Sequence, residues 1–256
     1  MLEVRNITKR YNGIPAVNNV SFVVRPYEVL GYLGPNGSGK STTANMLAGL
    51  LQPSQGHIYF DGRDIQDHPI EYKKRLGYVQ EEPYIYPHLS GLEYLQLVGR
   101  LRGLPEGLLN RKSEELLRLF GLHSDRHALI SGYSKGMRQK ILISAALLDD
   151  PDILIFDEPL SGLDVTSALV FRDLVAALAR RGKIILYSSH VLEVVEKICS
   201  RVIILRGGNI VTDDSVDRLR DLMKLPSLED IFAELVLQED TSTTAGQIAE
   251  TMRMSA

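Results

Sequence analysis

A glycine-rich loop near the N-terminus constrains the fold of this chain more than any other feature. It follows a short apolar run, Val29 to Leu33, and precedes a stretch with helical spacing, Lys40 to Leu51, which Pro53 closes. A strand, a glycine-rich loop and a helix in this order are the opening unit of many α/β folds. The loop itself runs through Gly34, Pro35, Asn36, Gly37, Ser38, Gly39, Lys40, Ser41 and Thr42.

The residue types of this loop suit a bound phosphate. Glycines allow positive φ and a close backbone approach, so that consecutive N–H groups can point inward and form an anion nest. The following helix adds its positive end, Lys40 can reach the β and γ phosphates, and the Ser41 hydroxyl can ligate Mg²⁺. A glycine-rich turn without a ligand is the alternative. The flanking strand and helix favour the phosphate loop, and we predict that the chain binds a nucleotide, with Mg²⁺ at Ser41.

The rest of the chain alternates strands with helices. Two apolar, β-branched runs, Ile153 to Phe156 and Ile184 to Tyr187, are typical of parallel strands that are covered on both faces. Alternating runs at Leu2 to Val4 and Val17 to Val24, with the turn-formers Asn12-Gly13 and Pro15 between them, predict an antiparallel sheet at the start. A hairpin is expected around Gly207-Gly208-Asn209. The predicted fold class is α/β, a P-loop NTPase core with a parallel sheet and an N-terminal antiparallel β subdomain.

A helical subdomain is predicted inside this core, at about residues 84–148. Leucines recur there at helical spacing around a Gly103-Leu104-Pro105 break, with little strand signal. The whole ATP-binding domain is expected to cover residues 1–237. Residues 238–256 are polar and poor in core formers, so we expect a mobile C-terminal tail.

Composition narrows the functional classes. The 256 residues carry a formal net charge of -3, which gives no electrostatic drive toward nucleic acid, and we expect no nucleic-acid partner. A single cysteine, Cys199, excludes an intrachain disulfide and suits a buried packing role. No signal peptide is recognisable, and no apolar run reaches the roughly 18 residues of a spanning helix. We expect a cytoplasmic chain whose membrane function, if any, needs a partner.

Polar groups follow the two buried runs where each predicted strand ends. Asp157 and Glu158 follow the first, and His190 follows the second. Ligands of open α/β sheets gather at the carboxyl ends of the strands, so these groups should converge with the loop. We assign Asp157 to Mg²⁺, Glu158 to the attacking water as its base, and His190 to the γ-phosphate or that water. The alternatives are that both acids cap the next helix and that the histidine is an ordinary packed residue.

Several segments together resemble the ATP-binding subunits of ABC transporters. They are the phosphate loop, Tyr78-Val79-Gln80, the run from Tyr133 to Gln139, the Asp157-Glu158 pair, Ser161-Gly162-Leu163-Asp164 and His190, in the order seen in that family. The resemblance covers roughly residues 2 to 212. As a set it is specific, because unrelated phosphate-loop enzymes lack the Ser134 and Ser161 segments.

The resemblance implies further roles. Tyr11 would stack on adenine, although a strand-edge tyrosine is the alternative, and Gln80 would touch Mg²⁺ and relay to the membrane subunit. Ser134 and Gly136 would complete the site of the opposite subunit, and Asp164 would couple the two sites. The implied activity is ATP hydrolysis that powers a membrane-spanning permease subunit on a separate chain, at the cytoplasmic face of the cell membrane.

The Ser134 segment also makes physical sense alone. Serine is a strong N-cap, and Met137, Ile141, Ala145 and Leu148 follow at helical spacing, so this helix should present its positive end to an anion. The loop and this helix start are expected to lie too far apart to grip one nucleotide. We therefore predict a head-to-tail homodimer with two ATP molecules at its interface.

The segment departs from the commonest family pattern at three positions. Tyr133, Lys135 and Met137 stand where leucine, glycine and glutamine are usual. These residues, together with the tail segment from Ser227 to Phe232, resemble the exporter branch that handles drugs, antibiotics, lipids or polysaccharides. The alternative is a soluble ATPase of the same family that is not coupled to transport. Such relatives usually carry two cassettes or a long coiled-coil insertion, and this sequence has neither.

Overall fold

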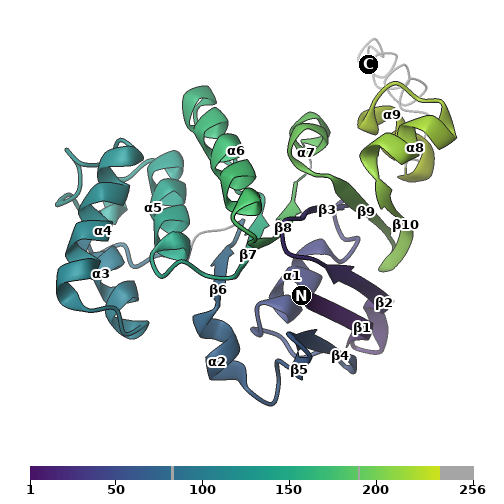
Figure 1. Ribbon diagram of the computed structural model, residues 1–256, viewed down its shortest axis with the longest axis horizontal. Helices are drawn as coiled ribbons and strands as arrows, with labels where there is room; N and C mark the ends of the chain where they lie inside the picture. The colour runs from purple at the N-terminus through teal and green to yellow at the C-terminus, as the bar shows by residue number, and fades with distance from the viewer. Residues whose placement is uncertain (82–83, 190, 237–256) are drawn as a thin grey trace, which may run out of the picture.

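The computed structural model describes residues 1–81, 84–189 and 191–236. His190 and the tail predicted at 238–256 lie outside the described residues. The elements fall into an antiparallel sheet, a larger core sheet with helices on both faces, and a group of helices at one end (Figure 1).

The N-terminal antiparallel sheet has the strand order β2-β1-β4-β5. Strands β1 (Leu2–Tyr11) and β2 (Ile14–Val24) are joined by Asn12 and Gly13, whose φ values of 49° and 83° suit a two-residue hairpin turn. Pro15, expected in the turn, instead pairs with Arg10 inside β2. That is tolerated because β2 is an edge strand, where a missing N–H costs little. Strands β4 (Gln55–Phe60) and β5 (Arg63–Asp64) complete the sheet.

The core sheet has the order β10-β9-β3-β8-β7-β6. Its parallel strands are β3 (Val29–Leu33), β6 (Leu76–Val79), β7 (Ile153–Asp157), β8 (Ile184–Ser188) and β9 (Arg201–Arg206), and β10 (Asn209–Ser215) pairs antiparallel with β9. Every residue of β3, β7 and β8 is buried, as their continuous apolar runs predict. The predicted parallel sheet and closing hairpin are confirmed.

Two hydrophobic clusters flank this sheet, and alternate residues of each strand serve them. Ile153 and Ile155 pack toward α1 (Lys40–Leu47) and the antiparallel sheet, whereas Leu154 and Phe156 pack toward α6 (Val165–Arg180) and α7 (Leu192–Ile198) (Figure 1). The predicted helix to Leu51 ends earlier, because Gly49 at φ 64° terminates it. The remaining core helices are α2 (Pro69–Lys74), α8 (Val216–Met223) and α9 (Leu228–Val236).

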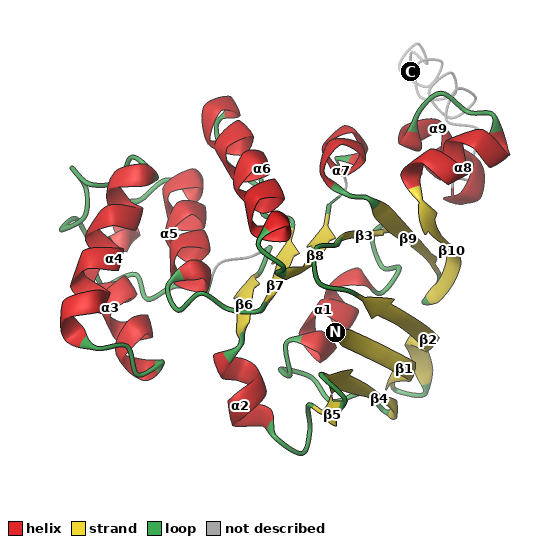
Figure 2. Ribbon diagram, viewed as in Figure 1, coloured by secondary structure: helices red, strands yellow, loops and turns green. Residues whose placement is uncertain are grey.

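The predicted helical insertion is confirmed. Helices α3 (Gly91–Leu101), α4 (Glu106–Leu119) and α5 (Lys135–Leu147), with the short 3₁₀ turn Ile130–Gly132, stand together at one end without a strand among them (Figure 2). Their own core includes Leu95, Leu117, Tyr133 and Ile141. Arg102 attaches the group to the core sheet: its guanidinium donates to the Leu76 carbonyl at 3.1 Å and pairs with Asp149 at 2.6 Å.

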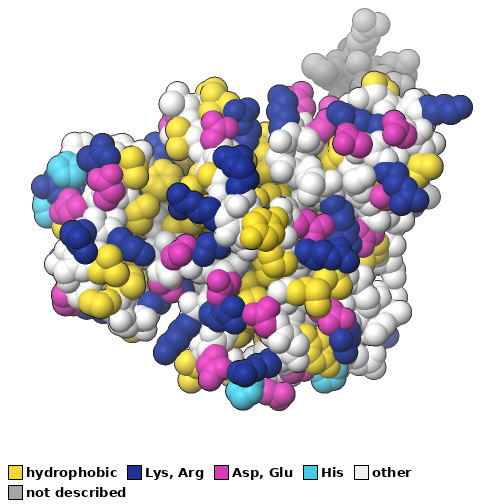
Figure 3. Space-filling view, in the orientation of Figure 1, with side chains coloured by type: hydrophobic (Ala, Val, Ile, Leu, Met, Phe, Trp, Pro, Cys, Tyr) yellow, Lys and Arg dark blue, Asp and Glu magenta, His cyan; other side chains and the backbone are white. Residues whose placement is uncertain are grey.

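Not one of the helices placed between residues 1 and 236 combines the length and the apolar character that a span requires. Basic and acidic side chains are intermixed over the face seen in Figure 3, with apolar side chains gathered between the helical group and α6.

Candidate nucleotide-binding site

The glycine-rich loop connects β3 to α1 and is built so tightly that two of its glycines cannot be replaced in place. A Cβ on Gly39 would lie 2.5 Å from the Ala16 carbonyl oxygen, and Gly39 has φ 103° where it caps α1. A Cβ on Gly34 would lie 2.3 Å from the Ser38 hydroxyl. Because neither position has room for a side chain, glycine lets the loop fold this tightly, as a loop that wraps around a small anion must.

Neighbouring elements hold this loop in place. The Gly208 N–H, in the β9–β10 hairpin, donates to the Ser38 carbonyl at 3.2 Å, and the Asn18 N–H donates to Gly208 at 2.8 Å. On the helix side, the Tyr32 hydroxyl donates to Thr43 Oγ1 at 3.2 Å. The loop encloses a hollow of about 240 Å³, lined by Ala16, Gly37, Gly39, Lys40, Ser41 and Thr42. The first N–H groups of a helix have no partner inside it, so α1 presents its positive end to this hollow.

Lys40 is the basic side chain of the loop. Its ammonium group donates to the carbonyl oxygens of Gly34 at 2.7 Å and Pro35 at 3.2 Å. Burial lowers the pKa of Lys40, and the negative charges of Glu158 and Asp157 offset part of that shift. The ammonium group therefore lies between the loop and the acidic pair, where a phosphate oxygen could replace a carbonyl as its partner.

The described ends of three core strands lie side by side. Asp157 ends β7 opposite Ser188 of β8, and Ser188 also pairs with Tyr32 of β3, the strand that leads into the loop. The Glu158 N–H donates to the Ser188 carbonyl at 3.0 Å, and the Ser189 hydroxyl donates to Glu158 Oε2 at 3.3 Å. Glu158 has φ 48°, an uncommon conformation for a residue with a side chain, and it marks a backbone held at a sharp corner.

The oxygen groups around Asp157 fit a magnesium ion. Asp157 is 2% exposed, and its Oδ1 has no hydrogen-bond partner among the residues that the structure describes, which is costly for a buried carboxylate unless a ligand satisfies it. Ser41 lies in the first turn of α1, and the half-buried Gln80 follows β6, the strand beside β7. Within the described ranges no cluster of three or more His, Cys, Asp or Glu could hold a metal. Mg²⁺ needs none, because it usually keeps waters and phosphate oxygens beside one or two protein ligands.

Tyr11 lies at the end of β1 and is 49% exposed. It pairs with Ile14 across the hairpin turn, close in the chain to Ala16, which lines the hollow. The Lys9 ammonium lies 5.8 Å from the centre of its ring. An exposed aromatic ring is a surface on which a base can stack.

Ser134 and Gly136 lie elsewhere. The Ser134 hydroxyl accepts the Met137 N–H at 3.2 Å and caps α5, as predicted. Helix α5 belongs to the helical group and stands apart from α1 (Figure 1), and neither residue lines the hollow of the loop. A Cβ on Gly136 would lie only 2.4 Å from the Gly162 carbonyl oxygen, so the start of α5 rests directly on the segment that follows Glu158.

Two contacts that the sequence analysis missed join α5 to the same segment. The fully buried Gln139 donates its amide to the Pro159 carbonyl at 3.1 Å. Lys140 pairs with Asp164 at 3.4 Å, and Asp164 caps α6 by accepting the N–H and hydroxyl of Ser167. Gln139 shares its side of α5 with Ile143 and Ala146, opposite the predicted stripe through Met137 and Ile141, and a glutamine among apolar residues was the available signal for the first contact.

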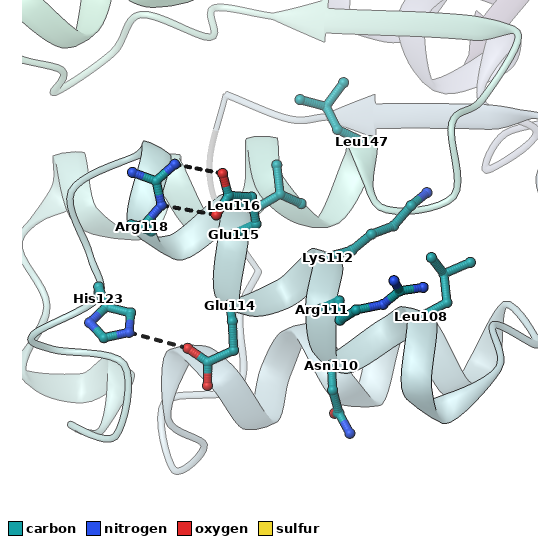
Figure 4. A pocket seen from close by; sticks show the side chains of 10 residues that line it. All are labelled: Leu108, Asn110, Arg111, Lys112, Glu114, Glu115, Leu116, Arg118, His123 and Leu147. Carbon is teal, nitrogen blue, oxygen red and sulfur yellow. Dashed lines mark hydrogen bonds and ion pairs between the residues drawn. The ribbon is translucent and has the colours of Figure 1, made fainter.

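A larger hollow of about 920 Å³ lies on α4, away from these groups (Figure 4). Its charged side chains are paired with one another or with the backbone: Arg118 with Glu115 at 2.6 Å, His123 with Glu114 at 3.4 Å, and Lys112 with the Leu148 carbonyl at 2.8 Å. It therefore offers no group poised for chemistry.

Comparisons with known proteins agree with this geometry. The sequence model of the ABC transporter family matches residues 17–161. The chain is 38% identical over 237 residues to the ABC transporter ATP-binding protein NatA of Bacillus subtilis (strain 168), covering 91% of this chain and 96% of that protein. It is 32% identical over 241 residues to the ABC-type transporter ATP-binding protein EcsA of the same organism, covering 93% and 98%.

Solved structures of ATP-binding subunits agree with the sequence comparisons. A structure of the ATP-binding subunit of an ABC transporter superposes with a TM-score of 0.86 at 33% identity, over 92% of this chain and 99% of that one. A dimeric ATP-binding cassette in a post-hydrolysis state, bound to ADP and Pi, shares the fold with a TM-score of 0.78 at 24% identity, over 84% and 98%. The chain belongs to the ABC transporter family, as one of its ATP-binding and ATP-hydrolysing subunits.

Proposed function

We propose that this chain powers an ABC exporter through a dimer that closes on two Mg-ATP molecules. One observation carries the proposal. The chain holds two anion-binding halves, the phosphate loop and the Ser134 helix start, and they stand apart within one copy. A second copy, turned head to tail, would bring each loop to face the other copy's α5.

Within each site the roles follow from chemistry. Lys40 and the loop N–H groups would hold the β and γ phosphates, and Tyr11 would stack on the base. Mg²⁺, when bound, would neutralise phosphate charge, with Ser41, Gln80 and Asp157 as its protein-side contacts.

Glu158 would take a proton from the attacking water as its oxygen bonds to the γ-phosphorus. The bond from that phosphorus to the bridging oxygen breaks, which leaves ADP and phosphate. His190 would contact the γ-phosphate or the water.

A permease on a separate chain would take up the resulting motion, at the cytoplasmic face of the membrane. An apolar groove of about 620 Å³ supports this partner. It is lined by Tyr84, Ile85, Tyr86, Tyr94, Leu97, Val98 and Leu101. Tyr84 and Leu101 are 84% and 79% exposed, and exposed aromatic and aliphatic side chains around a groove are typical of protein interfaces. The groove lies between α3 and residues 84–86.

Two relatives favour export. The chain is 36% identical over 211 residues to the linearmycin resistance ATP-binding protein LnrL of Bacillus subtilis (strain 168), covering 82% of this chain and 68% of that protein. It is 33% identical over 221 residues to the Nod factor export ATP-binding protein I of Cupriavidus metallidurans (strain CH34), covering 86% and 73%. Both names describe the removal of a compound from the cell or protection against one.

Mixing two inactive variants tests the shared site. Lys40→Ala disables the loop and Ser134→Ala weakens the helix start, so each pure variant should release little phosphate from Mg-ATP. In a mixed dimer one site carries both lesions and the other carries none. Random mixing should therefore restore up to about a quarter of the wild-type rate, because half of the dimers have one intact site of two. If the mixture is no more active than its components, each copy works with its own loop and helix.

Glu158→Gln gives the complementary measurement. It should bind ATP, release no phosphate and accumulate as a dimer in size-exclusion chromatography. Without hydrolysis, the closed dimer is not converted back to the open state. A Glu158→Gln protein that turns over like the wild type would remove Glu158 from its role as the base.

A further inference from the structure

Tyr133 is the residue immediately before the Ser134 cap, where the family usually has leucine. Its side chain is 4% exposed and belongs to the core of the helical group. The hydroxyl donates to the Asp125 carbonyl at 2.7 Å, in the loop between α4 and the 3₁₀ turn. Burial raises the pKa of Tyr133, so the hydroxyl keeps its proton and remains a donor at physiological pH. A leucine could fill part of this space but could not make the bond.

The start of α3 fits around this hydroxyl. A Cβ on Gly91 would lie 2.7 Å from the Tyr133 hydroxyl oxygen, 3.0 Å from Ile141 Cδ1 and 3.4 Å from the Tyr133 ring. A contact below 3.0 Å forces a displacement, so an alanine at position 91 would push the Tyr133 hydroxyl out of its place. The tyrosine and the glycine are therefore a matched pair.

A backbone ladder joins the same two regions. The Ile130 N–H donates to the Leu89 carbonyl at 2.8 Å, the Ser131 N–H donates to Pro87 at 2.9 Å, and Ser90 pairs with Leu129. Residues 87–90 and residues 129–131 thus form one hydrogen-bonded unit, and the Tyr133 hydroxyl adds a side-chain hydrogen bond beside it.

We infer that Tyr133 is a positioning residue: its hydroxyl, packed against Gly91, holds Ser134 and the start of α5 where they meet the nucleotide of a second copy. The inference rests on the proposed shared site. Tyr133 does not touch the nucleotide and acts through Ser134.

The test compares the ATP concentration needed for dimer formation in the Glu158→Gln background. Adding Tyr133→Phe removes only the hydroxyl, and the Asp125 carbonyl keeps the Ala128 N–H at 2.8 Å as a partner, so the variant should fold. We expect the midpoint for dimer formation to rise about five-fold, the equivalent of one hydrogen bond. Binding of a fluorescent ATP analogue to the dilute monomer should stay unchanged, because the phosphate loop lies between β3 and α1, outside the helical group. Tyr133→Leu, the residue usual in the family, should behave like Tyr133→Phe.

Tyr72→Phe is a closely matched control. Tyr72 is also 4% exposed, and its hydroxyl donates to the Leu47 carbonyl at 2.7 Å, but it lies on α2. It should lower stability to a similar extent without moving the midpoint. Gly91→Ala should raise the midpoint with Tyr133 present, and Tyr133→Phe should relieve that effect, because without the hydroxyl the added methyl group meets only the Ile141 tip and the ring.

Each outcome is decisive. If Tyr133→Phe and Tyr72→Phe lower the melting temperature equally and neither shifts the midpoint, Tyr133 is only a packing residue and the inference is wrong. If the effects of Gly91→Ala and Tyr133→Phe simply add, the matched pair is wrong. If Glu158→Gln with native Tyr133 never dimerises, the proposed shared site itself fails, and the inference fails with it.

Discussion

Replacing Gly136 by alanine places a methyl group against the carbonyl oxygen of Gly162. The new Cβ would lie 2.4 Å from that oxygen, where ordinary contact begins at 3.4 Å, so one of the two segments must move by roughly 1 Å. Neither yields cheaply. Gly136 lies in the first turn of α5, and the Ser161 N–H donates to the Glu158 carbonyl at 3.1 Å, which fixes the opposing segment.

The expected cost follows from these contacts. Overpacking of this kind costs about 1–3 kcal/mol, and the better helix propensity of alanine returns about 1 kcal/mol. The net loss of about 0–2 kcal/mol should lower the melting temperature by no more than about 8 °C. Activity should fall much further, by about a hundred-fold, because a 1 Å displacement of groups that orient a reaction has an effect of that size.

Phosphate release and thermal melting of the same preparations measure both quantities. Gly132→Ala is the control, since a Cβ there meets nothing within 4 Å although it lies in the same stretch of chain. It should leave both quantities near wild type. A Gly136→Ala protein that keeps its activity within two-fold would refute the reasoning, because it would show that the contact between α5 and Gly162 does not set the geometry of the site.

Three further outcomes are expected. The thiol of Cys199 is 6% exposed and burial raises its pKa, so it should react with a thiol reagent only after unfolding, and fast labelling of the native chain would contradict its packing role. Arg102→Ala should lower the free energy of unfolding in urea by about 1–3 kcal/mol, since it leaves the part-buried Asp149 without its 2.6 Å partner. The Ser167 hydroxyl and N–H hold the pKa of Asp164 below its usual 3.8, so the cap stabilises the fold above that pH and loses its effect as pH falls toward the lower folded pKa. The stability gap between wild type and Asp164→Ala should therefore shrink in acid, and a gap that widens would contradict it.

Local sequence was enough for the elements that carry the loop and the strand ends. The glycines before Lys40 and the buried runs before Asp157 and Ser188 leave few alternatives, because each is a short segment whose residue types serve one conformation. Strand β6 gave no such signal. Gly77 stands in it because a Cβ there would lie 2.5 Å from the Ala146 carbonyl oxygen of α5, a contact between segments far apart in the chain.

The same limit applies to the site. The sequence indicated Ser134 as a cap, but not that Gly136 rests on Gly162 or that Tyr133 reaches Asp125, because these depend on how the helical group docks on the core. His190 remains a prediction from its place after β8.

The position of β3 in the sheet also has a consequence for synthesis of the chain. Its neighbours on both sides, β8 and β9, follow the whole helical group in sequence, and the Gly208 N–H that supports Ser38 comes later still. While the ribosome is still making the helical group, the strand before the phosphate loop has neither of its partners, and it must wait in an unpaired, apolar state. The phosphate loop is synthesised early but its strand gains its neighbours late, so the nascent chain depends on slow, non-local pairing and is most prone to aggregate before β9 emerges.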